Sequence, residues 1–368
     1  MNYKKLDTPS LLIDREIMID NCKFMQNYAD RKKVKLRPHT KTHKMSALAL
    51  KQVELGASGI ATAKVGEAEV MAEEGLKDIF IANEIVGDIK LSRIKKLAEK
   101  ADISFGADSI EQLKMIERNF ADSKNKAEIL IEIEVGEERS GVIKEEDYIN
   151  LLKYLKKCNN IHLKGIFSHD GHSYRAKNKK DCREIHLTSQ RRTLHFAEIA
   201  ENMGFELETV SVGSTPSMMF DFPILDGITE IRPGTYIFMD ASQANAYGSL
   251  DRNAATVLTT VISLPTEERI ITDVGAKGLT TQTRSEGFCV TKGLGLIKGN
   301  SEIYIDDVYD EHAIIYNREF HDTLDIGDKL EIIPNHICPV VNLYDKAYLI
   351  SDNKVVEEIE IDCRGKLR

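Results

Sequence analysis

The sequence predicts an α/β protein, with a (β/α)8 barrel of the TIM type followed by a C-terminal all-β domain. Between about residues 34 and 232, short apolar segments alternate with longer helical ones, a pattern typical of a parallel sheet with crossover helices. Eight such units in about 200 residues fit a closed barrel better than an open sheet. After about residue 245, short β-prone segments follow one another without strongly predicted helices, which indicates a separate β domain.

The expected division of the chain follows from these patterns. Residues 11–244 are expected to form the barrel, and residues 245–368 are expected to form the β domain. Residues 1–10 are expected to join the β domain, because the barrel series starts only at Val34. A chain of 368 residues is long enough for two domains with a large core.

The predicted helices and strands follow from apolar runs in the sequence, and their ends from capping residues and glycines. Asp14 and Ser109 are residue types that cap helix N-termini, and Gly75 suits a helix C-terminus. After a short strand at Leu11–Ile13, helices are expected at residues 14–30, 45–56, 65–74, 88–100, 108–121, 145–158 and 180–203. Barrel strands are expected at Val34–Arg37, Gly59–Ala63, Asp78–Asn83, Ile103–Gly106, Ile129–Val135, Leu163–Ser168, Thr209–Gly213 and Thr229–Arg232. Strands of the β domain are expected at Val257–Ile262, Ile270–Asp273, Glu302–Tyr304, Lys329–Ile333 and Lys346–Ile350.

Composition and charge argue against several classes of protein. The net charge of −9 argues against a broad nucleic-acid surface. No apolar stretch approaches about 18 residues, so neither a spanning helix nor a membrane partner is expected. The N-terminal residues contain no apolar signal core. The six cysteines are scattered without a CxxC pair, which fits free thiols in a reducing cytoplasm. We therefore expect a cytoplasmic protein.

A basic motif, RPHTKTHK, follows the first predicted barrel strand. With strand-like alternation, Arg37, His39, Lys41 and His43 share one face of the chain, and Lys44 lies on the other. Burial, or crowding by the neighbouring cations, would lower the pKa of Lys41 and free its amine for carbonyl chemistry. A solvated basic loop is the alternative interpretation of this run.

Two further motifs follow the fifth and sixth predicted strands, where barrels carry out their chemistry. Arg139 could hold an anionic oxygen, or it could be a surface arginine in a charged loop. His169 and His172 could transfer protons or contact a ring. A hydrogen-bonded structural role is the alternative for these histidines.

The loops after the seventh and eighth strands carry small and hydroxyl residues. Hydroxyls and free backbone amides at the start of a short helix suit a phosphate group. Barrels often bind phosphate between these two loops, although a simple helix cap would have the same composition. The candidate residues are Gly213, Ser214, Thr215, Gly234, Thr235 and Tyr236.

The predicted β domain contains a possible metal site in the motif PNHICP. His336 and Cys338 alternate onto one face of an extended chain, so both could bind one ion. An imidazole with a thiolate favours zinc over magnesium, and two protein ligands leave room for substrate and water. Taken alone, a His-x-Cys pair is common and usually does not bind a metal.

The motifs RPHTKTHK, RSG, HDGHSY, GSTPS, EIRPGTY and PNHICP occur in this order over nearly the whole chain. In this combination the chain resembles the D-threonine aldolase and D-serine dehydratase group of alanine-racemase-like, fold-type III pyridoxal phosphate enzymes. The resemblance implies that Lys41 carries pyridoxal 5'-phosphate as a Schiff base, with His39 also beside the cofactor. It implies that Arg139 lies near the ring oxygen, and that the Gly213–Thr215 and Gly234–Tyr236 loops hold the phosphate.

The resemblance also implies catalytic roles and a metal. His169 and Tyr174 would face the cofactor ring, and His336 with Cys338 would hold zinc, or another divalent metal, beside the substrate. We find no counterpart of the second-domain catalytic tyrosine of alanine racemase, so racemisation is disfavoured. A homodimer is expected, because enzymes resembling this chain are often head-to-tail dimers.

The residue at the metal motif distinguishes the reactions within this group. Dehydratases of the group show His-x-Cys and aldolases usually show His-x-Asp, so Cys338 favours elimination. The expected activity is that of a zinc-dependent D-serine dehydratase-like lyase. It would convert a D-3-hydroxy amino acid (D-serine, D-threonine or D-3-hydroxyaspartate) into a 2-oxo acid and ammonia. The alternatives are a metal-dependent D-threonine aldolase, which yields glycine and an aldehyde, and a non-catalytic pyridoxal phosphate-binding protein. Arg175 and Arg284 are candidates to recognise a second substrate carboxylate, or are surface residues.

Overall fold

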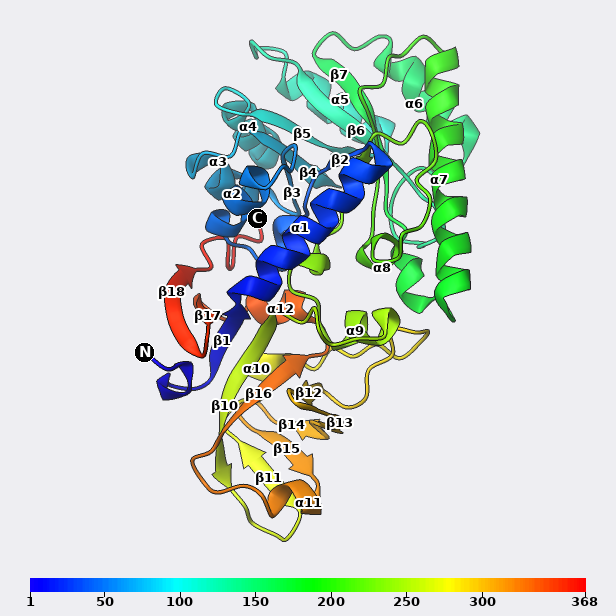
Figure 1. The fold of residues 1–368 in the computed structure, drawn as a ribbon. Helices are drawn as coiled ribbons and strands as arrows, with labels where there is room; N and C mark the ends of the chain where they lie inside the picture. The colour runs from blue at the N-terminus through cyan, green and yellow to red at the C-terminus, as the bar shows by residue number, and fades with distance from the viewer.

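The computed structural model describes residues 1–368 and contains two sheets, one of eight strands and one of ten. The eight-stranded sheet forms the barrel in the upper half of Figure 1, and the ten-stranded sheet forms the β domain below it. The predicted fold class, a (β/α)8 barrel followed by a β domain, is confirmed.

The barrel consists of eight parallel strands in the order β2-β9-β8-β7-β6-β5-β4-β3. A parallel bridge between His39 and Ala61 joins the two ends of this order and closes the ring. The strands are β2 (Lys35–Leu36), β3 (Ile60–Thr62), β4 (Asp78–Glu84), β5 (Asp102–Ala107), β6 (Ala127–Ile133), β7 (Ile161–Ser168), β8 (Thr209–Val212) and β9 (Glu230–Ile231).

Helices surround the barrel, and local capping fixes where several of them begin. The Asp14 carboxylate accepts a hydrogen bond from the Ile17 amide at the start of α1, as predicted from the sequence. The Asn178 side chain caps α7 in the same way, by accepting from the Asp181 amide. The helices are α1 (Arg15–Lys32), α2 (Ser46–Glu54), α3 (Val65–Glu73), α4 (Asp88–Leu97), α5 (Ile110–Asn119), α6 (Glu145–Leu155), α7 (Lys179–Asn202) and α8 (Thr215–Met218). Three short 3-10 turns, η2 (Thr40–Thr42), η3 (Gly171–Arg175) and η4 (Thr235–Ile237), follow strands.

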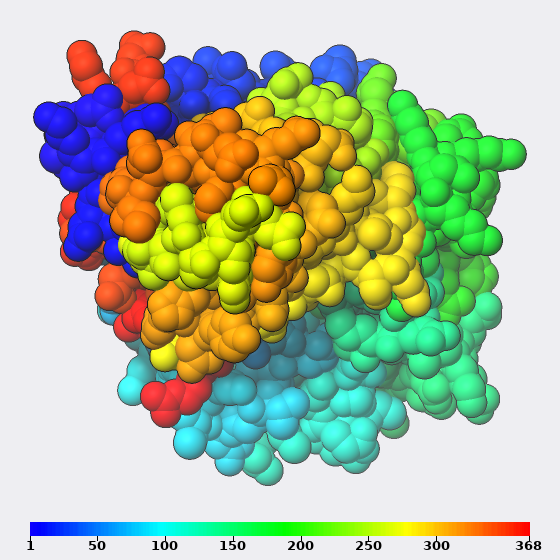
Figure 2. Space-filling model, turned by 90° about the horizontal axis from the view of Figure 1, so that it is seen from below, coloured from blue at the N-terminus to red at the C-terminus, as the bar shows by residue number.

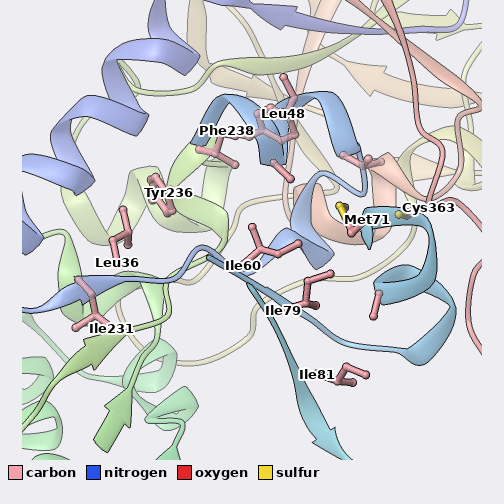
Figure 3. Packing of buried hydrophobic residues seen from close by; sticks show 14 of the residues in the cluster. Leu36, Leu48, Ile60, Met71, Ile79, Ile81, Ile231, Tyr236, Phe238 and Cys363 are labelled. Carbon is pink, nitrogen blue, oxygen red and sulfur yellow. The ribbon is translucent and has the colours of Figure 1, made fainter. Parts of the chain in front are cut away.

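The main core lies between the barrel strands and their helices. Figure 3 shows Leu36 and Ile231 of neighbouring strands beside Tyr236, with Leu48 and Phe238 further along the same packed layer. A smaller cluster inside the barrel contains Ala61, Phe80, Leu130 and Phe167. The rings of Phe80 and Phe167 meet edge to face, with centroids 5.0 Å apart. The barrel interior is therefore packed with side chains and is not a pore, so a ligand must bind at its rim.

The β domain includes a strand from the N-terminus. β1 (Ser10–Asp14) pairs antiparallel with β10 and parallel with β17, so it lies within the ten-stranded sheet. The division expected between residues 10 and 11 falls inside this strand. The other strands are β10 (Ala255–Ser263), β11 (Arg269–Thr272), β12 (Gly295–Ile297), β13 (Asn300–Tyr304), β14 (Asp307–Val308), β15 (Ala313–Tyr316), β16 (Lys329–Pro334), β17 (Lys346–Ser351) and β18 (Lys354–Glu360). Short helical pieces interrupt the domain: η1 (Tyr3–Lys5), α9 (Ala241–Tyr247), α10 (Ala276–Leu279), α11 (Arg318–His321) and α12 (Ile337–Val341).

The two domains meet at α12, which lies below the barrel in Figure 1. On the face shown in Figure 2, blue N-terminal residues lie beside the orange residues of the β domain, in agreement with the pairing of β1. The last residues of the chain return to the barrel, where the Gly66 amide donates to the Arg368 carbonyl. None of the helices combines the length and apolar character that crossing a bilayer would require.

Candidate active site between the two domains

A cavity of about 380 Å³ lies where the β domain covers the C-terminal ends of the barrel strands. Loops after β2, β6, β7, β8 and β9 supply most of its wall, and the β domain supplies the rest. The lining residues are His39, Lys41, Glu137, Arg139, His169, Gly171, Tyr174, Ser214, Thr215, Arg232, Gly234, Thr235, Arg284, His336 and Cys338. Residues nearly 300 positions apart in the sequence, such as Lys41 and Cys338, therefore share one wall.

The cavity brings together the site residues predicted from the sequence except Gly213, Tyr236, His172 and Arg175. The His172 ring packs against Gly136, where an added Cβ would meet it at 3.0 Å. Gly213 does not line it, because the glycine packs against the backbone of Arg232, which a Cβ would meet at 2.9 Å. Tyr236 points into the core, where its hydroxyl accepts a hydrogen bond from Gln52 at 2.9 Å. Figure 3 shows this ring among apolar side chains, so only the backbone of Tyr236 is available to a ligand at this loop.

The local structure around Lys41 differs from the predicted strand. β2 ends at Leu36, and Lys41 lies in the 3-10 turn η2. His39 caps this turn, because its Nδ1 accepts a hydrogen bond from the Lys41 amide at 3.4 Å. The Thr40 hydroxyl ties the turn to β3 by donating to the Ala61 carbonyl at 3.1 Å. The alternation argument for this motif was therefore wrong, because Pro38 follows the short strand and the chain turns instead of extending.

The turn separates the four cationic residues that alternation placed on one face. Arg37 points away from the cavity and pairs with Glu230 at 2.6 Å and with Asp78 at 2.7 Å. His43 is buried beside Phe238 and its Nε2 lies 3.2 Å from Gln52 Oε1. Burial lowers the pKa of His43 to about 4, so this imidazole is neutral at neutral pH.

Lys44 lies outside the cavity as well. Its ammonium pairs with the buried carboxylate of Glu67 at 2.5 Å. Lys41, in contrast, lines the cavity and makes no ion pair. Of the two lysines in the motif, only Lys41 can therefore offer its amine to a ligand in the cavity.

Burial is the main influence on the charge of the groups around Lys41. It lowers the pKa of the Lys41 ammonium, and the nearby Arg139 guanidinium lowers it further, while Cys338 and Glu137 oppose the shift. Burial, together with the positive charges of Lys41 and Arg139, lowers the pKa of His169 to about 3. His169 is therefore a neutral imidazole at neutral pH, able to donate or accept a hydrogen bond. Arg37 and His43 are not among the main influences on the pKa of Lys41, because both residues lie elsewhere.

Hydroxyls and amides gather at one end of the cavity. The Thr215 hydroxyl accepts hydrogen bonds from the amides of Gly234 at 3.3 Å and Thr235 at 3.1 Å, which links the loops after β8 and β9. Ser214 Oγ lies 2.9 Å from Ser173 Oγ and 3.1 Å from Ser217 Oγ. These groups form the predicted small-residue cradle at the cavity wall.

A buried acid supports this cradle from behind. Ser217 donates to Asp170 Oδ2 at 2.6 Å, and His186 Nδ1 lies 3.2 Å from the same oxygen. Hydrogen bonds from these two partners hold the pKa of Asp170 well below its usual range despite burial. The chain Asp170–Ser217–Ser214 therefore fixes the Ser214 hydroxyl at the cavity.

The β domain contributes His336 and Cys338, which flank the first residue of α12. The buried Asp240 carboxylate accepts a hydrogen bond from the intervening Ile337 amide at 3.1 Å. His336 Nδ1 lies 3.1 Å from Gln282 Oε1, an acceptor that favours a proton on Nδ1 and leaves Nε2 free. The Cys338 thiol donates to the Thr42 hydroxyl at 3.4 Å. The structure contains no group of three or more His, Cys, Asp or Glu side chains that could hold a metal ion.

Four cavity residues were not assigned as site residues from the sequence. Arg232 is part of the EIRPGTY motif. Its guanidinium lies over the rings of Phe80 and Phe167 and donates a hydrogen bond to the Ser168 carbonyl. Glu137 and Gly171 meet closely, since a Cβ on the glycine would be 2.0 Å from the Glu137 carboxylate. Arg284 was named only as one candidate for carboxylate recognition, and Arg175, the other candidate, is exposed and outside the cavity.

The side chains in the cavity are chemically suited to both of the expected ligands, the phosphate-bearing cofactor and the metal ion. An amine of lowered pKa, a hydroxyl and amide cradle, and three arginines suit an aldehyde cofactor that carries a phosphate. The neutral imidazole of His336 and the thiol of Cys338 suit zinc, with positions left for other ligands. The volume of about 380 Å³ lies within the range of small-molecule sites, which is about 300–1,000 Å³.

Two family models match the chain, one for each domain. Residues 13–242 match the model described as alanine racemase, N-terminal domain, and residues 254–350 match a putative serine dehydratase domain. A D-threonine aldolase from Arthrobacter sp. is 32% identical over 365 residues, covering 98% of this chain and 93% of that protein. A solved D-threonine aldolase from Filomicrobium marinum is 28% identical, with a TM-score of 0.89 over 100% of this chain and 97% of that chain.

A third relative is a dehydratase. The solved D-threo-3-hydroxyaspartate dehydratase from Delftia sp. HT23 is 26% identical, with a TM-score of 0.89 over 97% of this chain and 98% of that chain. Solved variants of a D-threo-3-hydroxyaspartate dehydratase replace a histidine, and separately a cysteine two positions later, by alanine, the cysteine variant being in a metal-free form.

Proposed function

The chain belongs to the alanine racemase N-terminal domain family, among the lyases of D-3-hydroxy amino acids, and we propose that it eliminates water from such a substrate. The family uses pyridoxal phosphate. The products would be a 2-oxo acid and ammonia, because the enamine left by loss of water is hydrolysed. For D-serine the 2-oxo acid is pyruvate.

We assign the cofactor to Lys41 and to the cradle around Ser214. Once bound, the cofactor supplies an electron sink for the carbanion that forms at the α-carbon of the substrate. Lys41 is the only lysine that lines the cavity, and burial lowers the pKa of its amine, so we assign it both the attachment of the cofactor and acceptance of the α-proton. The Ser214 and Thr215 hydroxyls, in the two loops that the Gly234 and Thr235 amides link, would hold the phosphate.

Arginine and histidine side chains complete the assignment. Among the neighbouring cations, Arg139 has the largest effect on the pKa of Lys41. A guanidinium in this position suits an anionic oxygen on the cofactor ring. His169, neutral at neutral pH, would contact the ring or relay a proton, and Tyr174 would face the ring from the same loop. His39 would support the turn that carries Lys41, through its hydrogen bond to the Lys41 amide.

The proposal assigns a divalent metal, zinc by preference, to His336 and Cys338. Such a metal supplies Lewis-acid assistance to the departure of the β-hydroxyl. Asp240 and Gln282 hold the two ligands in place, and Thr42 and Thr235 lie against the sulfur at 3.4 and 3.7 Å. Elimination therefore needs the barrel and the β domain together, since the amine comes from one and the metal donors from the other.

The observation that supports elimination over carbon–carbon cleavage is the cysteine at position 338. The histidine and cysteine substituted in the dehydratase variants have the same spacing as His336 and Cys338. The second candidate is a D-threonine aldolase, which the 32% identity to such an enzyme favours. In that reaction a base would take the proton of the β-hydroxyl, and glycine and an aldehyde would result.

A product assay separates the two candidates. D-serine, D-threonine and D-3-hydroxyaspartate are offered to metal-stripped and zinc-restored protein, and 2-oxo acid and glycine are both quantified. The proposal expects zinc-dependent 2-oxo acid without glycine. Glycine with an aldehyde would establish the aldolase instead, and no turnover of any substrate would support a non-catalytic binding protein. The homodimer stays a prediction, which sedimentation analysis of the purified protein would check.

A further inference from the structure

Arg284 is a cavity cation without an anionic partner. Arg139 pairs with Glu137 at 3.5 Å, and Arg232 donates to the Ser168 carbonyl. The Arg284 guanidinium forms no ion pair and no hydrogen bond in the structure, and its Nε is buried without a partner. A buried donor left unpaired has lost its hydration without gaining a hydrogen bond, so an anion that pairs with this guanidinium would bind favourably.

The guanidinium is held in a fixed place. It lies over the Tyr174 ring, 4.3 Å from the centroid. Its loop is anchored to the barrel by the Phe288 amide, which donates to the Ala176 carbonyl at 2.7 Å. Within the loop, the Thr291 amide donates to the Arg284 carbonyl at 3.2 Å. An arginine that is held this way needs little ordering when it binds a carboxylate, to which it can present two parallel N–H groups.

The position of the loop relative to the metal donors indicates which part of a substrate Arg284 would meet. Gln282, two residues before Arg284, lies 3.1 Å from His336 Nδ1. The phosphate cradle around Ser214 is built from other loops, after β8 and β9. Arg284 therefore belongs to the metal side of the cavity, where the β-hydroxyl of the substrate would be bound.

We propose that Arg284 binds a second carboxylate, carried on the β-carbon of the substrate, so that the enzyme prefers D-3-hydroxy dicarboxylic amino acids such as D-3-hydroxyaspartate. This inference rests on the proposed function and names its substrate class. The β-carbon carries both the hydroxyl and the third substituent, so a group beside the metal meets that substituent. A hydrogen or methyl group there would leave the guanidinium unpaired, and sites built for a polar group reject analogues that lack it.

Steady-state kinetics of two variants test the proposal. For Arg284→Gln we expect kcat/KM with D-3-hydroxyaspartate to fall by about 100-fold, while kcat/KM with D-serine stays within about 3-fold. Arg284→Lys keeps the charge but loses the two parallel N–H groups, so its loss with D-3-hydroxyaspartate should be smaller. Arg175→Gln is the matched control, because Arg175 is exposed on the neighbouring turn and lies outside the cavity.

Three kinetic outcomes would overturn the proposal. An equal loss with both substrates would mean that Arg284 binds the α-carboxylate, which all amino acids share. An unchanged preference would mean that the arginine has only a structural role. Wild-type turnover of D-serine or D-threonine without D-3-hydroxyaspartate would contradict the inference alone, whereas no turnover of any of the three contradicts the proposed function.

A binding measurement gives a readout that needs no turnover. Malate and 3-hydroxypropionate correspond to D-3-hydroxyaspartate and D-serine without the amine, and they differ by the carboxylate in question. Calorimetry on the zinc-loaded protein should show tighter binding of malate, and Arg284→Gln should remove the difference. Equal binding of the two acids by the wild-type protein would contradict the proposal, whatever the turnover assay shows.

Discussion

The thiol of Cys338, at the start of α12 in the β domain, lies 3.4 Å from the hydroxyl of Thr42 in the barrel. Thr42 belongs to the same 3-10 turn as Lys41. The contact therefore sets the spacing between the amine proposed to carry the cofactor and the sulfur proposed to bind the metal. A reaction that needs both groups on one substrate depends on this spacing.

Removing this contact should weaken metal binding without removing the cofactor. For Thr42→Val we expect about a 10-fold loss of zinc affinity, the lower end of what outer partners of metal ligands contribute. The absorbance of the bound cofactor should persist, because Lys41 is unchanged. Zinc titration monitored by a competing chelator measures the effect. Thr62→Val, a buried threonine outside the cavity, is the control, and equal affinities in both variants would contradict the role assigned to Thr42.

The cradle network predicts a coupled loss of stability and cofactor affinity. Ser217→Ala removes a donor to the buried Asp170 carboxylate, which should cost about 1–3 kcal/mol in the free energy of unfolding. Ser214 loses a neighbour as well, so cofactor affinity should fall. Urea unfolding and titration of the cofactor into the apo-protein measure the two effects. Ser189→Ala, whose buried hydroxyl has no partner, should show neither loss, and parallel behaviour of the two variants would refute the network.

The ion pairs of Arg37 should matter for stability and not for chemistry. Arg37→Met leaves the buried Glu230 carboxylate without its cation, which should destabilise the protein by about 3–5 kcal/mol. The exposed pair Arg118–Asp88 provides the comparison, and Arg118→Met should destabilise the protein far less than Arg37→Met. Chemical unfolding measures both values. A small effect at Arg37 would mean that this end of the barrel tolerates an unpaired carboxylate.

Glu84 predicts a pH dependence of stability. Burial and the neighbouring Glu132 carboxylate raise the pKa of Glu84 above the ordinary value of 4.5. A carboxyl whose pKa is raised by folding contributes its full stability below pH 4.5, and this contribution falls as the pH rises above that value. Glu84→Gln removes this titration, so its gain in melting temperature over the wild type should be larger at pH 8 than at pH 5. The exposed Glu99→Gln should show no such trend, and a gain independent of pH would contradict the assignment.

The sequence predicted the fold and the position of most site residues, because both follow from chain order. Strand and helix alternation predicts the barrel, and residues just past its strands must meet at one rim. This argument placed His169, Ser214 and Thr235 together without any knowledge of side-chain packing. The Leu11–Ile13 strand was also predicted, but its partners β10 and β17 are too far along the chain for a local pattern to reveal.

The errors arose where a single turn changes the direction of a side chain. Alternation put Arg37 and His43 beside Lys41, but the chain leaves its strand at Leu36 and turns at residues 40–42. Tyr236 was expected in the loop that holds the cofactor phosphate, and only the folded chain shows that its ring lies in the core. Arg284 lies in a long loop of the β domain with no regular pattern, so only the folded chain shows that it reaches the cavity.

Peptide mapping after borohydride reduction of the cofactor-loaded protein tests the central claim most directly. Reduction makes the bond between the cofactor and its lysine permanent, and mass spectrometry then locates the modified residue. The account predicts that the cofactor is found on Lys41, and that Lys41→Ala removes the label while the variant stays folded. A label on Lys44, which is paired with Glu67, or on a lysine outside the cavity would contradict the account.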